Sequence, residues 1–261
     1  MTVRISDDAT VRHIVIDRPD RLNAVNEATL RHLSEAVTAA GEDPTVRVIV
    51  ISGAGRAFCS GGDLDVDDPF APETTERTID AAAALITAIR SVPRPVVAEI
   101  RGPAVGVGVS IALAADLAIA RSDAYFTMPF TAIGLMPDGG ATALVAAAAG
   151  RAVAMRLFAL GGRMTAHDAE RHGLIAAVLP AESFDADFAA ALANLRTISL
   201  AAFARTKSAL DAATLPHLGA AFEHERRGQR ELAGGKDFRA AVTAFTAGRG
   251  VSTGGTPPAK E

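Results

Sequence analysis

The sequence of 261 residues has little cysteine and few aromatic residues, with a single cysteine, no tryptophan and one tyrosine. One cysteine excludes an internal disulfide and a metal site built from several thiolates, and it suits a reducing cytoplasm. Cys59 lies in an apolar loop without a neighbouring base, so we interpret it as a buried structural thiol rather than a nucleophile. The six histidines are scattered without the spacing of a metal-binding set, and we expect no metal site.

An excess of positive charge is also missing, and so is any long apolar run. The formal net charge is −4, which argues against sequence-independent binding to nucleic acid. No uninterrupted apolar run approaches the roughly 18 residues that cross a bilayer, and the first residues lack the pattern of a secretory signal. No dinucleotide-binding or Walker glycine motif occurs, so a nicotinamide or nucleoside triphosphate cofactor has no support. We expect a soluble, cytoplasmic protein without a nucleic-acid or membrane partner.

The chain does contain an alternation of short β-branched runs and segments with helical periodicity. Turn-forming residues end the β-branched runs, which is typical of strands, and helices are predicted where apolar residues recur with the spacing of one helix face. The expected strands cover residues 11–16, 46–52, 95–100, 117–120, a short piece near 125, and 174–178. The expected helices cover residues 26–40, 74–90, 107–115, 140–149, 201–213 and 217–233. This order predicts an α/β fold with a mainly parallel sheet covered by helices, and an all-helical segment from residue 182 onward.

Two glycine-rich stretches are the most informative part of the chain. Residues 53–64 read GAGRAFCSGGDL, and residues 101–120 read RGPAVGVGVSIALAADLAIA. Glycine lets the main chain approach a ligand closely, and the second stretch runs from a turn into an apolar helix whose first amides lie at the positive end of the helix dipole. Two such N–H groups directed at one point would stabilise negative charge on a bound carbonyl oxygen, so we predict an oxyanion hole.

Five blocks of sequence resemble the crotonase, or enoyl-CoA hydratase/isomerase, superfamily in their order and spacing. They are RPDRLNAVN at residues 18–26, AFCSGGDL at 57–64, RPVVAEIRGPAVGVG at 94–108, IGLMPDGG at 133–140 and DFRAAVTAF at 237–245. The resemblance implies a crotonase-type spiral of β-β-α turns over residues 1–195, and a C-terminal helical segment, 196–248, that builds a homotrimer or hexamer. Residues 249–261 contain little to bury, and we expect them to be disordered.

The resemblance also implies an acyl-CoA substrate, in which coenzyme A is part of the substrate and no redox or metal cofactor takes part. The family polarises the thioester carbonyl with two backbone amides, which fall on Gly62 and Val107. The two glutamates of its hydratases fall on Ser110 and Phe130, so both carboxylates are absent. Addition of water needs groups that orient the water and move its protons, which argues against ordinary hydratase chemistry.

Although both hydratase glutamates are absent, the motif IGLMPDGG contains a carboxylate, Asp138. It resembles the base of the family's isomerases, which shift a double bond in an acyl-CoA. These isomerases include the epoxide isomerase of the phenylacetate pathway. One carboxylate is enough for isomerisation because it can remove a proton from one carbon and return it to another. Ser110, Phe130 and Met136 are expected to line the pocket, and apolar neighbours would raise the pKa of such a base. The alternative role is an N-cap, because Asp138 precedes the helix predicted at 140–149.

Coenzyme A needs a slot for adenine and cations for its phosphates, and the family places the adenine slot near the first two blocks. The expected contacts are Arg18, Arg21, the main chain of Ala24, Ser60 and Gly62, the aromatic Phe245 and, from a neighbouring subunit, Arg249. The acidic run that begins at Asp65 would repel a phosphate. Three functions stay open: an enoyl-CoA isomerase, which we favour; a hydratase or other lyase with replaced acid and base residues; and an acyl-CoA-binding protein without activity.

Overall fold

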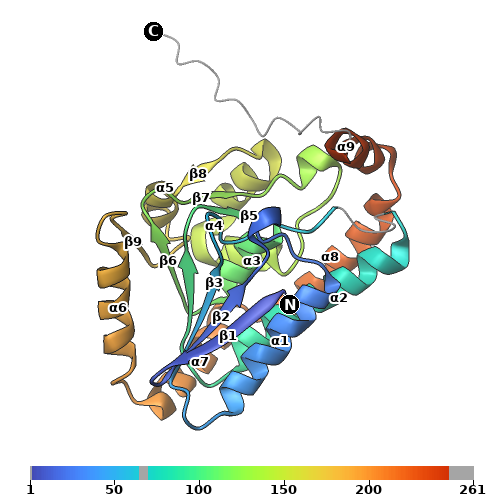
Figure 1. Ribbon diagram of the computed structural model, residues 1–261. Helices are drawn as coiled ribbons and strands as arrows, with labels where there is room; N and C mark the ends of the chain where they lie inside the picture. The colour runs from blue at the N-terminus through green and yellow to red at the C-terminus, as the bar shows by residue number, and fades with distance from the viewer. Residues whose placement is uncertain (1, 65–69, 247–261) are drawn as a thin grey trace.

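The computed structural model describes residues 2–64 and 70–246, which form two sheets packed against helices (Figure 1). The larger sheet has the order β1-β2-β3-β4-β6-β9, with β1 antiparallel to β2 and the other neighbours parallel. Its strands are β1 (Val3–Asp8), β2 (Val11–Ile16), β3 (Val48–Gly53), β4 (Val96–Ile100), β6 (Leu117–Arg121) and β9 (Ala177–Leu179). The smaller sheet, in the order β5-β7-β8, consists of β5 (Pro103–Val105), β7 (Tyr125–Thr127) and β8 (Met164–Thr165). The predicted α/β class with a mainly parallel sheet is confirmed.

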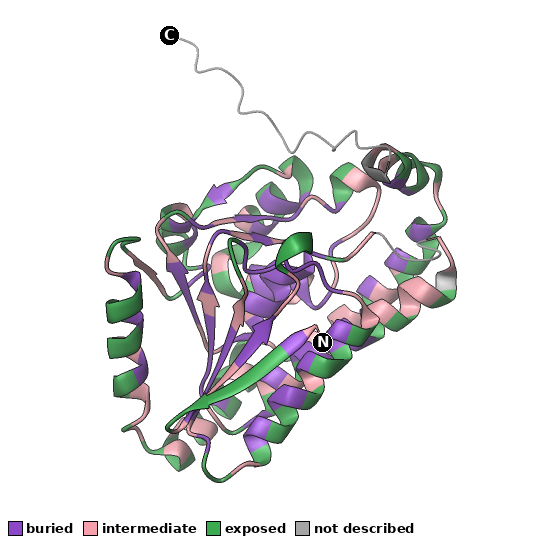
Figure 2. Cartoon of the chain, viewed as in Figure 1, coloured by how far each residue is buried: buried purple, intermediate pink, exposed green. Residues whose placement is uncertain are grey.

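The central strands are apolar on both faces because helices cover both faces, as is usual for parallel sheets. Ile49 and Ile51 of β3 point into the main core, to which α1 (Glu27–Glu42), α2 (Pro72–Ser91) and α3 (Val107–Ala114) contribute. Val48 and Val50 of the same strand pack with α6 (Phe184–Leu195) on the other face. The edge strand β1 is exposed along most of its length, as its green colour in Figure 2 shows.

Helix α4 (Ala141–Leu160) is longer than the helix predicted at 140–149. Gly150, with φ 79° and ψ 161°, is not helical and divides α4 into two pieces, which explains why the periodicity ended there. By length and composition alone, α4 is the helix among the described residues that could cross a membrane. The short elements β5, β8 and α5 (Ala166–Arg171) were not predicted, and the strand expected at 174–178 is displaced to β9.

Beyond β9 the described residues form helices, as predicted: α6, α7 (Leu200–Thr214), α8 (Leu218–Ala233) and α9 (Lys236–Thr246). Helix α7 is joined to the core by the buried Lys207, whose Nζ donates to the Ile89 carbonyl at 2.8 Å and to Asp116 Oδ2 at 2.9 Å. Arg90 extends this cluster because it pairs with both Asp116 and Asp211. Helix α8 runs beside α2 (Figure 1). The described part of the segment 196–248 therefore packs on the core of its own chain, and the expected tail, 249–261, lies outside the described residues.

Candidate active site

The two glycine-rich loops lie against each other. The amide of Val105 donates to the Cys59 carbonyl at 2.8 Å, and Cys59 forms an isolated parallel bridge with Ala104. A Cβ at Gly108 would lie 2.6 Å from the Cys59 carbonyl oxygen, so this close approach needs glycine. The free thiol of Cys59 is buried, which raises its pKa to about 12 and agrees with a structural role.

The predicted oxyanion donors are found on these two loops and border the same cavity. Among the hydrogen bonds of the described residues, neither the Gly62 amide nor the Val107 amide donates to a backbone acceptor, whereas the neighbouring Gly106 amide donates to the Thr127 carbonyl at 2.9 Å. Val107 is the first residue of α3, so its N–H belongs to the unsatisfied group at a helix start. Gly106, at φ 54° and ψ −126°, makes the turn that exposes this amide. Both donors are free to meet a carbonyl oxygen.

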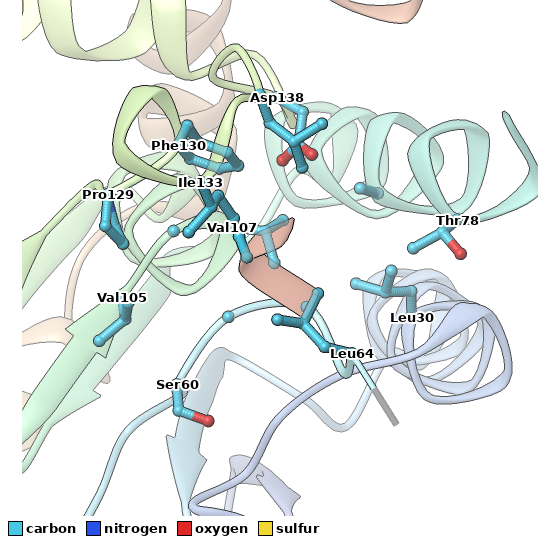
Figure 3. A pocket seen from close by; sticks show the side chains of 16 residues that line it. Leu30, Ser60, Leu64, Thr78, Val105, Val107, Pro129, Phe130, Ile133 and Asp138 are labelled. Carbon is cyan, nitrogen blue, oxygen red and sulfur yellow. The ribbon is translucent and has the colours of Figure 1, made fainter. Parts of the chain in front are cut away.

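The cavity has a volume of about 300 Å³ and is mostly apolar. Figure 3 shows its wall, to which α1 contributes Leu30, α2 contributes Thr78, and the segment before α4 contributes Phe130, Ile133 and Asp138. Helix α9 closes one side through Ala241. A second cavity of about 110 Å³ shares several of the same lining residues, and its own walls include Thr74, Ile79, Gln229 and Phe238. Asp138 lines both cavities, so it lies where they meet.

Asp138 is a partly buried carboxyl whose two oxygens have different surroundings. Oδ2 accepts a hydrogen bond of 2.9 Å from Gln229 Nε2, whereas Oδ1 is buried and has no partner among the described residues. Burial, and after it the charge of Glu225, raise the pKa of Asp138 to about 7, although the hydrogen bond from Gln229 acts in the opposite direction. A carboxyl with a pKa near neutrality can both accept and return a proton at physiological pH.

The N-cap alternative for Asp138 is wrong. The N-cap of α4 is Gly140, and no side chain from the Asp138 region caps the helix. The buried Glu225 of α8 takes this role instead: its carboxylate accepts from the Gly140 amide at 2.7 Å and from the Thr142 amide and hydroxyl at 2.9 and 2.6 Å. Because Glu225 binds the free amides at the helix start, the Asp138 side chain is released from that task.

Two of the three predicted pocket residues do not line either cavity. Phe130 does, and its ring lies next to Gly106. Ser110 is fully buried and donates from Oγ to the main-chain carbonyl of Asp138 at 2.9 Å, so it holds the Asp138 loop and does not face a ligand. Met136 packs against α8, where its sulfur fills the space beside Gly228, because its neighbour Leu135 takes the place in the cavity wall. The expectation for Ser110 and Met136 is therefore wrong.

Several of the expected coenzyme A contacts already form hydrogen bonds or ion pairs within the protein. Arg18 is bound internally, because its guanidinium pairs with Asp63 at 2.7 Å and donates to the Ala24 carbonyl. The Ala24 carbonyl oxygen therefore already accepts a hydrogen bond from Arg18. The Ser60 amide likewise already donates a hydrogen bond, to the Leu22 carbonyl. Arg21 is exposed beside this loop. The side chain of Phe245 and the whole of Arg249 lie outside the described residues.

The site contains three residues whose roles were not predicted from the sequence: Asn23, Glu225 and Gln229. Buried Asn23 donates from Nδ2 to the Ala54 and Ala57 carbonyls at 2.8 and 2.7 Å and thereby fixes the first oxyanion loop. Glu225 and Gln229 are exposed by 0% and 2%. A signal for them exists in α8, where they occupy the inward stripe Leu218, Phe222, Glu225, Gln229 and Ala233, so two polar residues stand at positions that helical spacing assigns to the core.

Comparison with known proteins agrees with this geometry. The family model described as enoyl-CoA hydratase/isomerase matches residues 6–252. A protein named probable enoyl-CoA hydratase from Rhodobacter capsulatus is 39% identical over 247 residues, which are 94% of each chain. The 1,2-epoxyphenylacetyl-CoA isomerase of Escherichia coli is 35% identical, over 92% of this chain and 93% of the relative. A solved enoyl-CoA hydratase structure from Mycobacterium avium subsp. paratuberculosis is 42% identical, with a TM-score of 0.88 over 95% and 97% of the two chains.

These matches define the class of the protein as an acyl-CoA-processing enzyme with the crotonase fold. The chain belongs to the enoyl-CoA hydratase/isomerase family, as its five sequence blocks indicated.

Proposed function

We propose that this enzyme shifts a double bond in an enoyl-CoA thioester, with coenzyme A bound as part of the substrate. The amides of Gly62 and Val107 hold the thioester oxygen while Asp138 removes a proton from one acyl carbon. The electron pair of the broken C–H bond moves into a dienolate whose negative charge rests on the held oxygen. Asp138 then returns the same proton to a different carbon, so the product is an isomer of the substrate.

One observation carries this proposal: Asp138 is the only titratable residue among the described residues that line the larger cavity. Hydration requires groups that activate water and protonate carbon, and neither Ser110 nor Phe130 can supply a carboxylate there. Isomerisation requires a single carboxylate that exchanges one proton. A pKa of about 7 and an unpartnered Oδ1 suit that carboxylate to the task.

The names of relatives support the proposal only in part. The Escherichia coli relative is named an isomerase, while the relatives from Rhodobacter capsulatus and Mycobacterium avium subsp. paratuberculosis are named hydratases. The residues at the cavity support the isomerase reaction that we propose.

The test compares wild-type protein with Asp138→Asn on two substrates. A 3-enoyl-CoA gains conjugated absorbance when it is isomerised, and crotonyl-CoA loses it when it is hydrated. We expect the wild type to act on the 3-enoyl-CoA and Asp138→Asn to lose roughly 10²- to 10⁴-fold in kcat, the range for loss of a general acid or base. Circular dichroism and acyl-CoA binding provide the controls for folding and for the pocket.

Three other outcomes would contradict the proposal. Hydration of crotonyl-CoA without isomerisation would favour the hydratase, and tight acyl-CoA binding without turnover on a broad substrate panel would favour a binding protein. Full isomerase activity in Asp138→Asn would remove the proton carrier.

We also propose that the enzyme works in the cytoplasm as a homotrimer or hexamer assembled through its C-terminal helices. Large apolar side chains exposed on these helices support an interface: Leu210 on α7 and Leu232 on α8. In such an assembly Arg21, Phe245 and a neighbouring subunit's Arg249 would contact coenzyme A, and sedimentation of the purified protein would measure the number of subunits.

A further inference from the structure

Gln229 is the side chain that fixes the orientation of the Asp138 carboxyl. Its Nε2 donates to two acceptors, the Met136 carbonyl at 2.7 Å and Asp138 Oδ2 at 2.9 Å. The side chain is almost completely buried on the inward face of α8, so it has no access to bulk water that could replace either contact. One amide group therefore holds the Asp138 carboxyl and the main chain two residues before it.

The Met136 carbonyl determines which way the Gln229 amide points. A carbonyl oxygen can only accept a hydrogen bond, so the NH₂ end of the amide has to face it. Turning the amide over would place Oε1 against two acceptor oxygens at once, with their repulsion uncompensated. Gln229 can therefore donate to Asp138 but cannot accept a proton from it. The buried Oε1 of Gln229 has no partner among the described residues. This agrees with an amide orientation that is determined by the two hydrogen bonds of Nε2.

This arrangement makes the two oxygens of Asp138 chemically different. Oδ2 faces a fixed donor, and a proton placed on Oδ2 would meet the Gln229 NH₂ group. Oδ1 is without a partner among the residues described, and Figure 3 shows the carboxyl directed from its loop toward the space bordered by Val107 and Thr78. Gln229 therefore holds the carboxyl through Oδ2 alone.

We propose that Gln229 is a positioning residue that holds the Asp138 carboxyl in one orientation where the two cavities meet. The proposal rests on the proposed function of Asp138 as proton carrier. In the reaction, a C–H bond of the acyl group breaks and an O–H bond forms at the Asp138 carboxyl, while Gln229 keeps the carboxyl in place through its hydrogen bond to Oδ2. The same O–H bond then breaks as the proton goes to the second carbon, and Gln229 exchanges no proton at any stage.

Few other titratable groups face this carboxyl. Glu225 lies one helical turn before Gln229 on α8, and its carboxylate binds the start of α4. Asp63 lines the smaller cavity and is paired with Arg18. The described residues of α1, α2, α3 and α9 that line the two cavities contribute no charged side chain. A substitution of Gln229 should therefore change the pH profile mainly through the pKa of Asp138.

The test uses Gln229→Met, which keeps the length of the side chain and removes both hydrogen bonds. We expect kcat for isomerisation to fall roughly 10- to 100-fold, as for small displacements of a catalytic group, with little change in KM. Loss of a donor to the carboxylate also moves the acid limb of the kcat/KM profile upward by about one pH unit. Glu231→Met, which places the same side chain at an exposed position of α8, is the matched control and should change neither quantity.

A second variant and a second measurement keep the test decisive. Gln229→Glu has nearly the same shape, so it guards against a folding failure of the methionine variant, and its carboxyl should move the pH limb upward even further. Infrared titration measures the titration midpoint of the Asp138 carboxyl directly, without substrate turnover. The Asp138 band is identified as the one that is missing in Asp138→Asn. An unchanged midpoint in both variants, or unchanged kcat in Gln229→Met, would overturn the role of Gln229.

The two proposals fail in different ways. If Asp138→Asn keeps its isomerase activity, the proposed function is wrong, whatever the Gln229 variants do. If Asp138→Asn loses turnover while the Gln229 variants keep the wild-type pH limb and infrared midpoint, the function stands and the positioning role of Gln229 is wrong.

Discussion

Replacing Asp138 with asparagine is expected to make the folded protein less sensitive to rising pH. Burial first, and the charge of Glu225 second, raise the pKa of Asp138 from 3.8 to about 7 in the folded state. An acid with a raised folded pKa leaves the fold fully stable below its unfolded pKa, and stability is lost as the pH rises through the folded pKa. Asparagine does not ionise, so the variant lacks this loss.

The magnitude follows from the width of the pKa shift. Each pH unit between the unfolded and folded pKa values removes about 1.4 kcal/mol, so a rise of about two units, from pH 5 to pH 7, removes about 3 kcal/mol from the wild type. The loss levels off above pH 7, where the folded state also ionises. The substitution adds a constant cost, because the asparagine NH₂ replaces a buried oxygen without a partner, but this cost does not vary with pH.

Urea unfolding at pH 5 and pH 8 measures the effect. The difference in unfolding free energy between Asp138→Asn and wild type should shift by about 3 kcal/mol in favour of the variant between the two pH values. Asp20→Asn, at an exposed aspartate, corrects for general effects of removing a negative charge. If the difference between Asp138→Asn and wild type is the same at both pH values, Asp138 does not have a raised pKa and the reasoning about the site fails.

Two further predictions concern parts of the fold that support the site. Lys207→Met removes the ion pair with the largely buried Asp116 carboxylate and should destabilise the protein by roughly 3 kcal/mol. A lower urea midpoint would show this loss, and an unchanged midpoint would contradict it. Gly106→Ala forces a side chain onto φ 54° and ψ −126°, a strain of about 1–3 kcal/mol that should turn the Val107 amide away. Its kcat should fall on the order of 10²-fold while acyl-CoA binding persists, and wild-type kcat would contradict either the displacement of the Val107 amide or its role as a donor.

The elements that the sequence predicted correctly are those whose pattern is local. The strands at 11–16 and 46–52 and the helix at 74–90 each show their own periodicity, and the structure has them with shifts of a few residues. Strand β5, only three residues long and starting at a proline, has no period to read. It exists because Ala104 pairs with Phe126 and Cys59, which are distant in sequence. Short strands of this kind depend on tertiary contacts that a single sequence does not display.

The candidate site divides in the same way. That Gly62, Val107 and Asp138 lie at one cavity could be predicted, because the glycine pattern, the helix start and the family motif are features of adjacent residues. The role of Gln229 could not, because its contact with Asp138 joins residues 91 positions apart. Ser110 was misplaced because α3 turns its hydroxyl toward the Asp138 carbonyl and away from the cavity, a matter of helix rotation that the motif leaves open.

Glu225 connects the stability of the fold to the chemistry of the site. Three hydrogen bonds from the start of α4 favour its charged form, although burial acts against it and raises its pKa overall. When Glu225 is charged, the same residue that caps α4 disfavours a second negative charge on Asp138 and so makes Asp138 a stronger base. Because α8 supplies both Glu225 and Gln229, the C-terminal helical segment contributes to the raised pKa of a carboxyl that the α/β core supplies and donates a hydrogen bond to it. In the mechanism that we propose, the reaction therefore depends on the C-terminal helical segment as well as on the α/β core.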